Sequence, residues 1–142
     1  MAKILIIDDE PSIRGVLQQL FEYEGHDVRL SGDALDGLEH LRRFEPDVTF
    51  LDVKMPGIDG LETLGRIRET DPGAVVVMVS GHGTIGTAVE ATRRGAFDFL
   101  EKPLDTDRLL LTLRNALELR GLSHRVEVLE HEVESRHEIV GA

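Results

Sequence analysis

Short apolar runs alternate with longer amphipathic segments along the first 120 residues of the chain. The short runs are rich in β-branched residues, and we expect them to form buried strands. They cover residues 3–8, 27–31, 47–52, 74–80 and 96–100. In the longer segments apolar residues recur at helical spacing, which predicts helices. These cover residues 11–25, 33–43, 61–70 and 84–94, and a last one begins near residue 105.

The predicted strands and helices follow one another in regular alternation. This order predicts a parallel sheet covered by helices on both faces, with right-handed crossovers. The first two helices should each bury one apolar stripe against that sheet. The stripes are Ile13, Val16, Leu17, Leu20 and Phe21 in the first helix, and Ala34, Leu35, Leu38 and Leu41 in the second.

The C-terminal segment differs, because residues 106–139 contain no proline and a single glycine, Gly121. Its first leucines should pack on the sheet: Leu109, Leu110, Leu113 and Leu117. The apolar residues that follow are spaced alternately by three and four, which predicts a coiled-coil seam between two chains. The seam consists of Leu119, Leu122, Val126, Leu129 and Val133. The alternative is one amphipathic helix that folds back onto its own domain.

Composition limits the classes of function that this chain can have. The net charge of −11 argues against nucleic-acid binding by this segment, because phosphate contacts require clustered Lys and Arg. The absence of cysteine excludes disulfides, thiolate metal sites and a cysteine nucleophile. No apolar run approaches the length of a membrane span, and the N-terminus lacks a signal-peptide pattern. We therefore expect a cytoplasmic protein with no membrane attachment.

Three carboxylates end two of the predicted strands. Asp8 and Asp9 close the first strand, and Asp52 ends the third. Open α/β sheets bind ligands at the carboxyl ends of their strands, so these acids should share one crevice. Crowded carboxylates repel one another unless a cation or a proton lies among them. Oxygen ligands without cysteine favour a hard ion, which predicts a Mg²⁺ site.

Two further polar residues end the fourth and fifth strands at the same expected edge. Lys102 precedes Pro103, which favours an extended backbone and directs the lysine along the edge. Its cation could neutralise a phosphoryl group, and the Ser80 hydroxyl could donate a hydrogen bond to one. The simpler interpretations are a surface lysine and a strand-end cap. We interpret His82 as an exposed loop residue rather than a catalytic one.

Together, Asp8-Asp9, Asp52-Val-Lys-Met-Pro-Gly, Ser80-Gly and Lys102-Pro103 resemble the receiver domain of two-component response regulators. The resemblance covers residues 1 to about 120. Within that family, the stretches that begin at Ser80 and Gly95 are similar to NtrC-type regulators, which activate sigma-54 promoters. The resemblance implies a doubly wound, five-stranded parallel sheet of the flavodoxin-like, CheY-like type, with an extended C-terminal helix.

The resemblance also implies a role for each strand-end residue. Asp52 would accept a phosphoryl group from a sensor histidine kinase. Asp9, Asp52 and the main-chain carbonyl of Lys54 would hold Mg²⁺, with Asp8 helping through water. Such a domain is not an enzyme in the usual sense, since it phosphorylates only itself from small donors and dephosphorylates only itself.

The same resemblance implies a switch. Ser80 and Lys102 would contact the phosphoryl oxygens, and Phe99 would turn inward as Ser80 moves. Because phenylalanine has no hydroxyl, such a switch would work by packing alone.

The domain organisation follows from the linker pattern and the resemblance together. We expect a receiver domain over residues 1–120 and a helical coiled-coil linker over residues 121–142 that leads to an absent AAA+ ATPase domain. The linker would make a homodimer, and any DNA contact would come from domains absent from this chain.

Two other functions remain as alternatives. A phosphatase of the haloacid dehalogenase type needs a second acid two residues after its aspartate nucleophile, and Lys54 stands at that position. A pseudo-receiver would dimerise without phosphorylation, although no expected site residue is missing. A flavin-binding module is disfavoured, because the first loop, Asp8-Asp9-Glu10-Pro11, would repel a phosphate.

Overall fold

The computed structural model describes residues 2–81 and 84–121, and its sheet has five parallel strands in the order β2-β1-β3-β4-β5. The strands are β1 (Lys3–Ile7), β2 (Asp27–Ser31), β3 (Val48–Asp52), β4 (Val76–Ser80) and β5 (Asp98–Glu101). The helices between them are α1 (Pro11–Tyr23), α2 (Ala34–Phe44), α3 (Gly60–Thr70) and α4 (Ile85–Arg93). A C-terminal helix follows over residues 106–121. The predicted doubly wound fold is confirmed.

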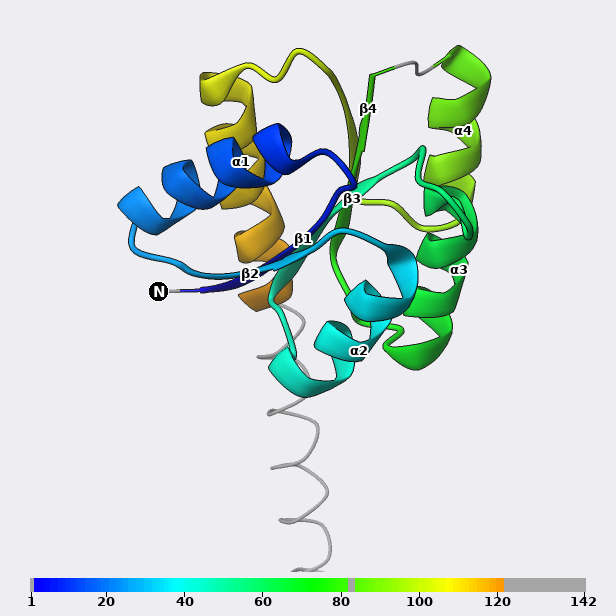
Figure 1. Cartoon of the computed structure of the whole chain (residues 1–142), viewed down its shortest axis with the longest axis horizontal. Coiled ribbons are helices and arrows are strands. Elements are labelled where there is room, and N and C mark those ends of the chain that lie inside the picture. Colours follow the sequence, from blue (N-terminus) through cyan, green and yellow to red (C-terminus); the bar gives the residue numbers. More distant parts are fainter. Residues whose placement is uncertain (1, 82–83, 122–142) are drawn as a thin grey trace, which may run out of the picture.

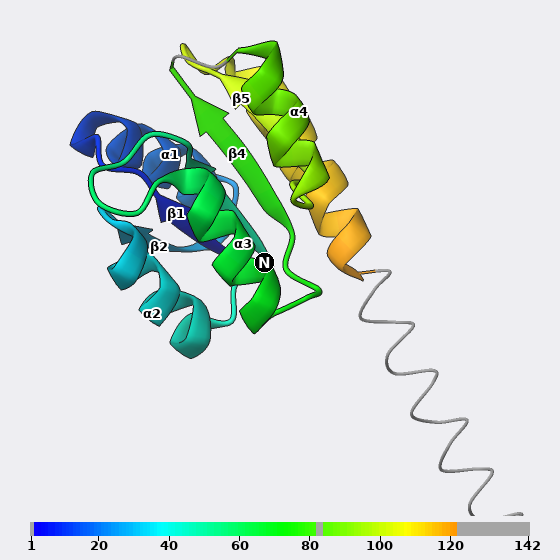
Figure 2. The same ribbon diagram turned by 90° about the vertical axis from the view of Figure 1, so that its right-hand side faces the viewer.

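Helices cover both faces of the sheet. Figure 1 shows α1 and the C-terminal helix on one side, and Figure 2 views the sheet from the side that α2, α3 and α4 cover. Strands β3 and β4 are buried along their whole length, because each face of the sheet meets a helical layer. Two apolar clusters result, one on each face. Phe21 and Phe50 anchor the first, with ring centroids 5.0 Å apart, and Leu64, Ile67 and Met78 lie in the second.

The order of the strands places the candidate acids at one edge. From β1 the chain adds β2 on one side of the sheet, and it then adds β3, β4 and β5 on the other side. Open α/β sheets form their ligand crevice at such a topological switch point, here between β1 and β3. Ile7 pairs with Leu51 in the β1–β3 register. The residues that follow this pair, Asp8 and Asp52, therefore end neighbouring strands.

Two predicted apolar positions are wrong. Val16 is 59% exposed and Leu35 is 66% exposed, so neither belongs to the buried stripe of its helix. Leu35 directly follows Ala34 and is rotated by about 100° from the stripe that Ala34 and Leu41 form. Val16 lies at the margin of the α1 stripe for the same reason. Each helix contacts the sheet through a narrower face than the apolar pattern alone indicates.

The C-terminal helix packs on the sheet, as predicted, and it does so on the side that α1 covers. Leu109 and Leu113 are buried, and Leu110 and Leu117 pack against the same cluster. Arg120 joins the last described turn of this helix to the loop between α3 and β4, because its Nη1 donates a hydrogen bond to the carbonyl of Gly73, at 3.0 Å. None of the helices within residues 2–81 and 84–121 has both the length and the apolar character needed to cross a membrane.

The predicted seam is only partly within the described residues. Leu119 is 42% exposed near the end of the C-terminal helix. Leu122, Val126, Leu129 and Val133 lie outside the described residues, so the seam stays a prediction.

Gly60 allows α3 to begin directly against the end of β3. Its N–H donates to the carbonyl of Val53 at 2.7 Å. A Cβ at this position would overlap the carbonyl oxygen of Asp52 and lie 2.6 Å from the Cα of Val53. The missing side chain therefore lets the helix support the strand end that carries Asp52.

Substitution of Gly60 by alanine should destabilise the fold, whereas the same substitution at Gly65 should not. Gly60→Ala forces backbone atoms apart and should cost about 1–3 kcal/mol of unfolding free energy. Gly65 lies in the same helix, and a Cβ added there would have nothing within 4 Å, so Gly65→Ala should stabilise by up to about 1 kcal/mol through helix propensity. Urea unfolding of both variants measures the contrast, and equal effects would show that Gly60 is not tightly packed.

Candidate functional site

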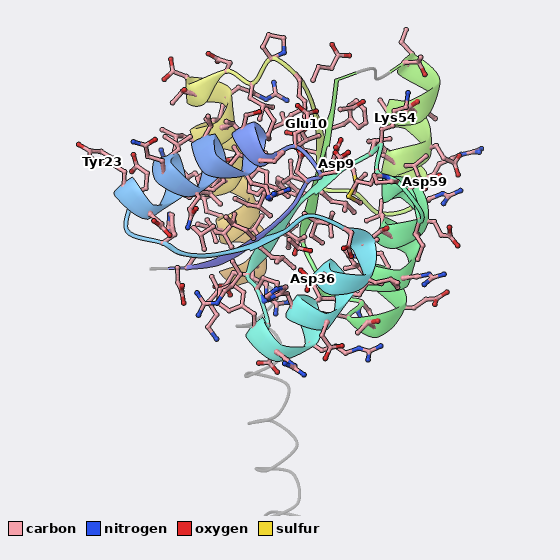
Figure 3. All side chains as sticks on the ribbon, viewed as in Figure 1. Asp9, Glu10, Tyr23, Asp36, Lys54 and Asp59 are labelled. Carbon is pink, nitrogen blue, oxygen red and sulfur yellow. The ribbon has the colours of Figure 1, made fainter. Side chains whose placement is uncertain are left out.

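Side chains from β1, β3 and β5 converge at the carboxyl edge of the sheet. A hollow of about 470 Å³ lies at this edge. Its lining residues are Asp9, Glu10, Asp52, Lys54, Met55, Pro56, Gly81 and Lys102. Asp9, Glu10 and Lys54 are labelled near this edge in Figure 3. A larger hollow of about 760 Å³ lies between the C-terminal helix and the end of α1, where Leu110, Leu113 and Leu117 give it a mainly apolar wall. The concentration of charged groups distinguishes the smaller hollow as the candidate site.

Four carboxylates meet at this edge of the sheet, and three of them, Asp9, Glu10 and Asp52, line the hollow. Asp8, Asp9, Glu10 and Asp52 each offer an oxygen within 4.8 Å of the others. Asp8 and Asp52 are buried, at 2% and 4% exposure, while Asp9 and Glu10 are more open to solvent. The described residues contain no other group of three or more acidic, histidine or cysteine side chains with this spacing. The all-oxygen ligand set is suited to a hard cation.

Lys102 supplies the positive charge among these acids. Its Nζ lies 3.0 Å from Glu10 Oε1, 3.1 Å from Asp8 Oδ2 and 3.7 Å from Asp52 Oδ2. The side chain is only 10% exposed, so the interpretation as an ordinary surface lysine is wrong. The backbone N–H of Lys102 donates to the carbonyl of Ser80 at 2.8 Å, which ties the end of β5 to β4. The Lys102–Pro103 peptide bond is cis.

Burial and neighbouring charge raise the pKa of Asp52 to about 7, from an ordinary value of 3.8. Burial is the main cause, and the negative charge of Asp8 and a hydrogen bond with Asp9 act in the same direction. The Lys102 charge and the N–H of Lys54 oppose the rise. Without a further cation, Asp52 is therefore poised to hold a proton near neutral pH.

The pKa of Lys102 is raised as well. Burial by itself would lower this pKa, but hydrogen bonds to Glu10 and Asp8 and the negative charges of Asp8 and Asp52 outweigh it. The lysine therefore stays protonated and balances part of the negative charge.

The remaining predicted residues occupy the same edge or its neighbourhood. Ser80 ends β4, is buried, and accepts the N–H of Lys102 through its carbonyl. The N–H of Lys54 points to Asp52 Oδ1 at 3.4 Å. Phe99 is partly buried and packs against the apolar cluster on the α2–α4 side. His82 lies outside the described residues.

The contact between Glu10 and Lys102 is not predicted by the sequence pattern. These residues are 92 positions apart, and the local pattern presents Glu10 only as part of a loop that repels phosphate. A carboxylate next to Asp9 is the one available signal. Its partner can be identified only once β5 is placed beside β4.

The comparisons with known proteins agree on one family. Residues 4–114 match the family described as the response regulator receiver domain. The chain is 43% identical over 140 residues to the nitrogen assimilation regulatory protein NtrX of Azorhizobium caulinodans. This alignment covers 97% of the chain and 31% of the relative. The chain is 40% identical over 139 residues to the C4-dicarboxylate transport transcriptional regulatory protein DctD of Pseudomonas aeruginosa. That alignment covers 98% of the chain and 30% of the relative. The chain thus spans about a third of the length of these relatives.

Solved structures give the same result. NtrX from Brucella abortus in complex with ATP superposes with a TM-score of 0.84 at 44% identity, over 90% of this chain and 29% of that one. A CheY-like receiver domain protein from Methanospirillum hungatei superposes with a TM-score of 0.83 at 27% identity, over 87% of this chain and 98% of that one. The second match extends over nearly the whole of that receiver domain protein.

Removal of the Asp52 charge should stabilise the metal-free protein, and the gain should depend on pH. Where the pKa of a carboxyl group is higher in the folded state than in the unfolded state, the free energy of unfolding falls as pH rises between the two pKa values. For Asp52 this range runs from about 4 to about 7. Asp52→Asn should therefore exceed the wild type by about 1–3 kcal/mol near pH 8, and the difference should shrink towards pH 4.

Urea unfolding in a chelating buffer across this pH range measures the effect. Asp107→Asn, at an exposed position in the first turn of the C-terminal helix, is the control and should show no gain in stability that grows with pH. A stability difference for Asp52→Asn that does not change with pH would contradict the raised pKa.

Proposed function

The chain belongs to the response regulator receiver domain family, as a two-component receiver of the NtrC type, and from this premise we propose that Asp52 accepts the phosphoryl group. One observation carries the proposal. Asp52 is buried at a strand end beside the hollow, an oxygen of Asp8 and one of Asp9 lie within 4.8 Å of a carboxylate oxygen of Asp52, and the ammonium of Lys102 lies 3.7 Å from it. Asp8 accepts a bond from Lys102 at 3.1 Å and is the more enclosed of the two other aspartates, whereas Asp52 faces the hollow.

The proposed reaction is a nucleophilic displacement. An oxygen of ionised Asp52 bonds to phosphorus, and the bond between phosphorus and the donor breaks, leaving the kinase histidine or acetate to carry away its electron pair. Attack by a carboxylate is hindered by repulsion between like charges. The ammonium of Lys102 would offset this repulsion, and we propose that the hydroxyl of Ser80, at the end of the neighbouring strand β4, donates to a phosphoryl oxygen.

The residues of the site fit Mg²⁺. We propose that Asp8, Asp9, Asp52 and the main-chain carbonyl of Lys54 hold it, because these are oxygen donors and the carboxylates lie within 4.8 Å of one another. When bound, Mg²⁺ would supply positive charge against the carboxylates and the phosphoryl oxygens. It would also favour the ionised form of Asp52, which is the form that acts as nucleophile.

Phosphorylation would be communicated through Ser80 and Phe99. Added phosphoryl oxygens would attract the Ser80 hydroxyl and vacate space beside β4. Phe99, which pairs with Met78 in the β4–β5 register and is only partly buried, would move inward into that space. The switch would act by packing, because Phe99 carries no hydroxyl.

A receiver implies a sensor histidine kinase as partner, and the rest of the regulator is proposed by analogy with the NtrC type. We propose that Leu119, Leu122, Val126, Leu129 and Val133 pair two chains, and that residues 121–142 lead to an AAA+ ATPase that acts at sigma-54 promoters. DNA would be contacted only by domains outside this chain, and the receiver would work in the cytoplasm. The domain would turn over only its own phosphoryl group. Lys54, at the position where a haloacid dehalogenase needs an acid, gives the phosphatase alternative no support.

Phosphoryl uptake should depend on Asp52. With Mg²⁺ and acetyl phosphate, intact-mass spectra should show one added phosphoryl group per chain. Asp52→Ala should abolish the addition, since no other nucleophile among the described residues occupies the hollow with the same surroundings, whereas Asp107→Ala should label as wild type. Equal labelling of the Asp52 variant would reject the assignment.

The seam should control self-association. Leu122→Asp with Leu129→Asp places charges in the proposed interface and should weaken dimerisation at least about ten-fold. His124→Asp with His131→Asp is the matched control, because it adds the same charges with the same spacing at heptad positions opposite the seam. Light scattering over a range of concentrations, with and without beryllofluoride, measures the association. A monomeric wild type under both conditions would contradict the coiled coil.

A further inference from the structure

The residue that precedes α1 uses its side chain differently from those at the other helix starts. Asp33, Asp59 and Thr84 each cap their own helix by accepting an N–H of the first turn. Glu10 occupies the equivalent position before α1 but makes no side-chain cap. Its carboxylate instead lies 3.0 Å from Lys102 Nζ, across 92 residues of sequence. A glutamate that does not cap but reaches across the site calls for an explanation at the site.

Glu10 competes with Asp52 for the same ammonium group. Lys102 has three N–H donors, and its two short contacts are with Glu10 and Asp8, at 3.0 and 3.1 Å. Asp52 is the most distant of the three carboxylates, at 3.7 Å. Asp8 is buried and needs the cation, whereas the side chain of Glu10 is 54% exposed and could equally be hydrated. The contact with Glu10 is therefore the one that can be given up at low cost.

We propose that Glu10 is a positioning residue that holds Lys102 away from Asp52 and releases it when a phosphoryl group arrives. The inference rests on the proposed role of Asp52. Phosphoryl oxygens at Asp52 are charged acceptors that compete with Glu10 for the ammonium, and the released glutamate returns to solvent. Glu10 thereby sets the affinity of the site for a phosphoryl group, because each uptake has to break its contact with Lys102.

Three variants separate this role from simpler ones. Glu10→Gln keeps the shape and removes the charge. Glu10→Asp keeps the charge near the start of α1, where the helix dipole favours it, but is one methylene too short to maintain the contact. Glu101→Gln removes one charge from the exposed end of β5, next to Lys102 in sequence, and serves as the matched control. If charge or helix dipole alone mattered, Glu10→Asp would behave as wild type.

Binding of beryllofluoride, a non-covalent phosphoryl mimic, is the first test. It is titrated at Mg²⁺ concentrations that saturate each variant, with Mg²⁺ affinity measured separately, and amide resonances report the dissociation constant. Glu10→Gln and Glu10→Asp should both bind about three- to ten-fold more tightly than wild type, and Glu101→Gln should change by less than about two-fold. Unchanged affinity in Glu10→Gln, or wild-type affinity in Glu10→Asp, overturns the proposal.

Labelling of lysines by acetic anhydride is the second test and needs no metal. The chain contains three lysines, and Lys3, at the start of β1, is the internal reference for Lys102. Lys102 should be acetylated about three-fold faster or more in both Glu10 variants, because no carboxylate at position 10 then reaches its ammonium group, and Glu101→Gln should match wild type. An unchanged rate overturns the proposal.

Melting curves verify that every variant is folded. If Lys102 of the wild type is acetylated as expected but the wild type fails to bind beryllofluoride, the acceptor role of Asp52 is rejected, and the proposed release of Lys102 by Glu10 with it. A wild type that binds beryllofluoride while the Glu10 variants bind equally well rejects only the inference.

Discussion

The ammonium group of Lys102 offsets a repulsion that the parallel sheet itself creates. Neighbouring parallel strands end side by side, so acids at the ends of β1 and β3 are brought together whatever their charge. Burial prevents water from screening them, and burial together with the charge of Asp8 raises the pKa of Asp52. One lysine cannot balance four carboxylates. The site is therefore left with a deficit of positive charge, which is the condition that favours a cation and makes the charge state of Asp52 sensitive to its surroundings.

This electrostatic arrangement depends on backbone positions that carry no charge. Gly60 lets α3 start against the backbone of Asp52 and Val53, so the strand end cannot move without moving a helix. The N–H of Lys102 fixes the end of β5 to β4 through Ser80. Because the interior is close-packed, small changes at these strand ends have to be passed to the layers around them. Phe99, half-buried next to β4, is placed where such a change would be felt.

The partition of Lys102 between Glu10, Asp8 and Asp52 adds a further level of control. Two of its partners are enclosed and one is half exposed, so the three contacts differ in what it costs to break them. In a receiver of this kind the ease with which the lysine changes partner influences how strongly a phosphoryl group is held. A surface residue at a helix start can thereby tune a buried site without touching the acceptor.

The order of elements and the positions of the acids were readable from the sequence alone. Strand and helix periodicities are short-range properties, so the βα alternation and the strand-end residues Asp8, Asp9, Asp52, Ser80 and Lys102 could be predicted without a structure. Tertiary structure decided the rest. It showed that Val16 and Leu35 face solvent, because the width of a helix contact depends on the neighbouring layer. It also paired Lys102 with Glu10 and required a glycine at position 60. Such contacts join segments far apart in the chain, and their partners are set by strand order and packing, which no local pattern encodes.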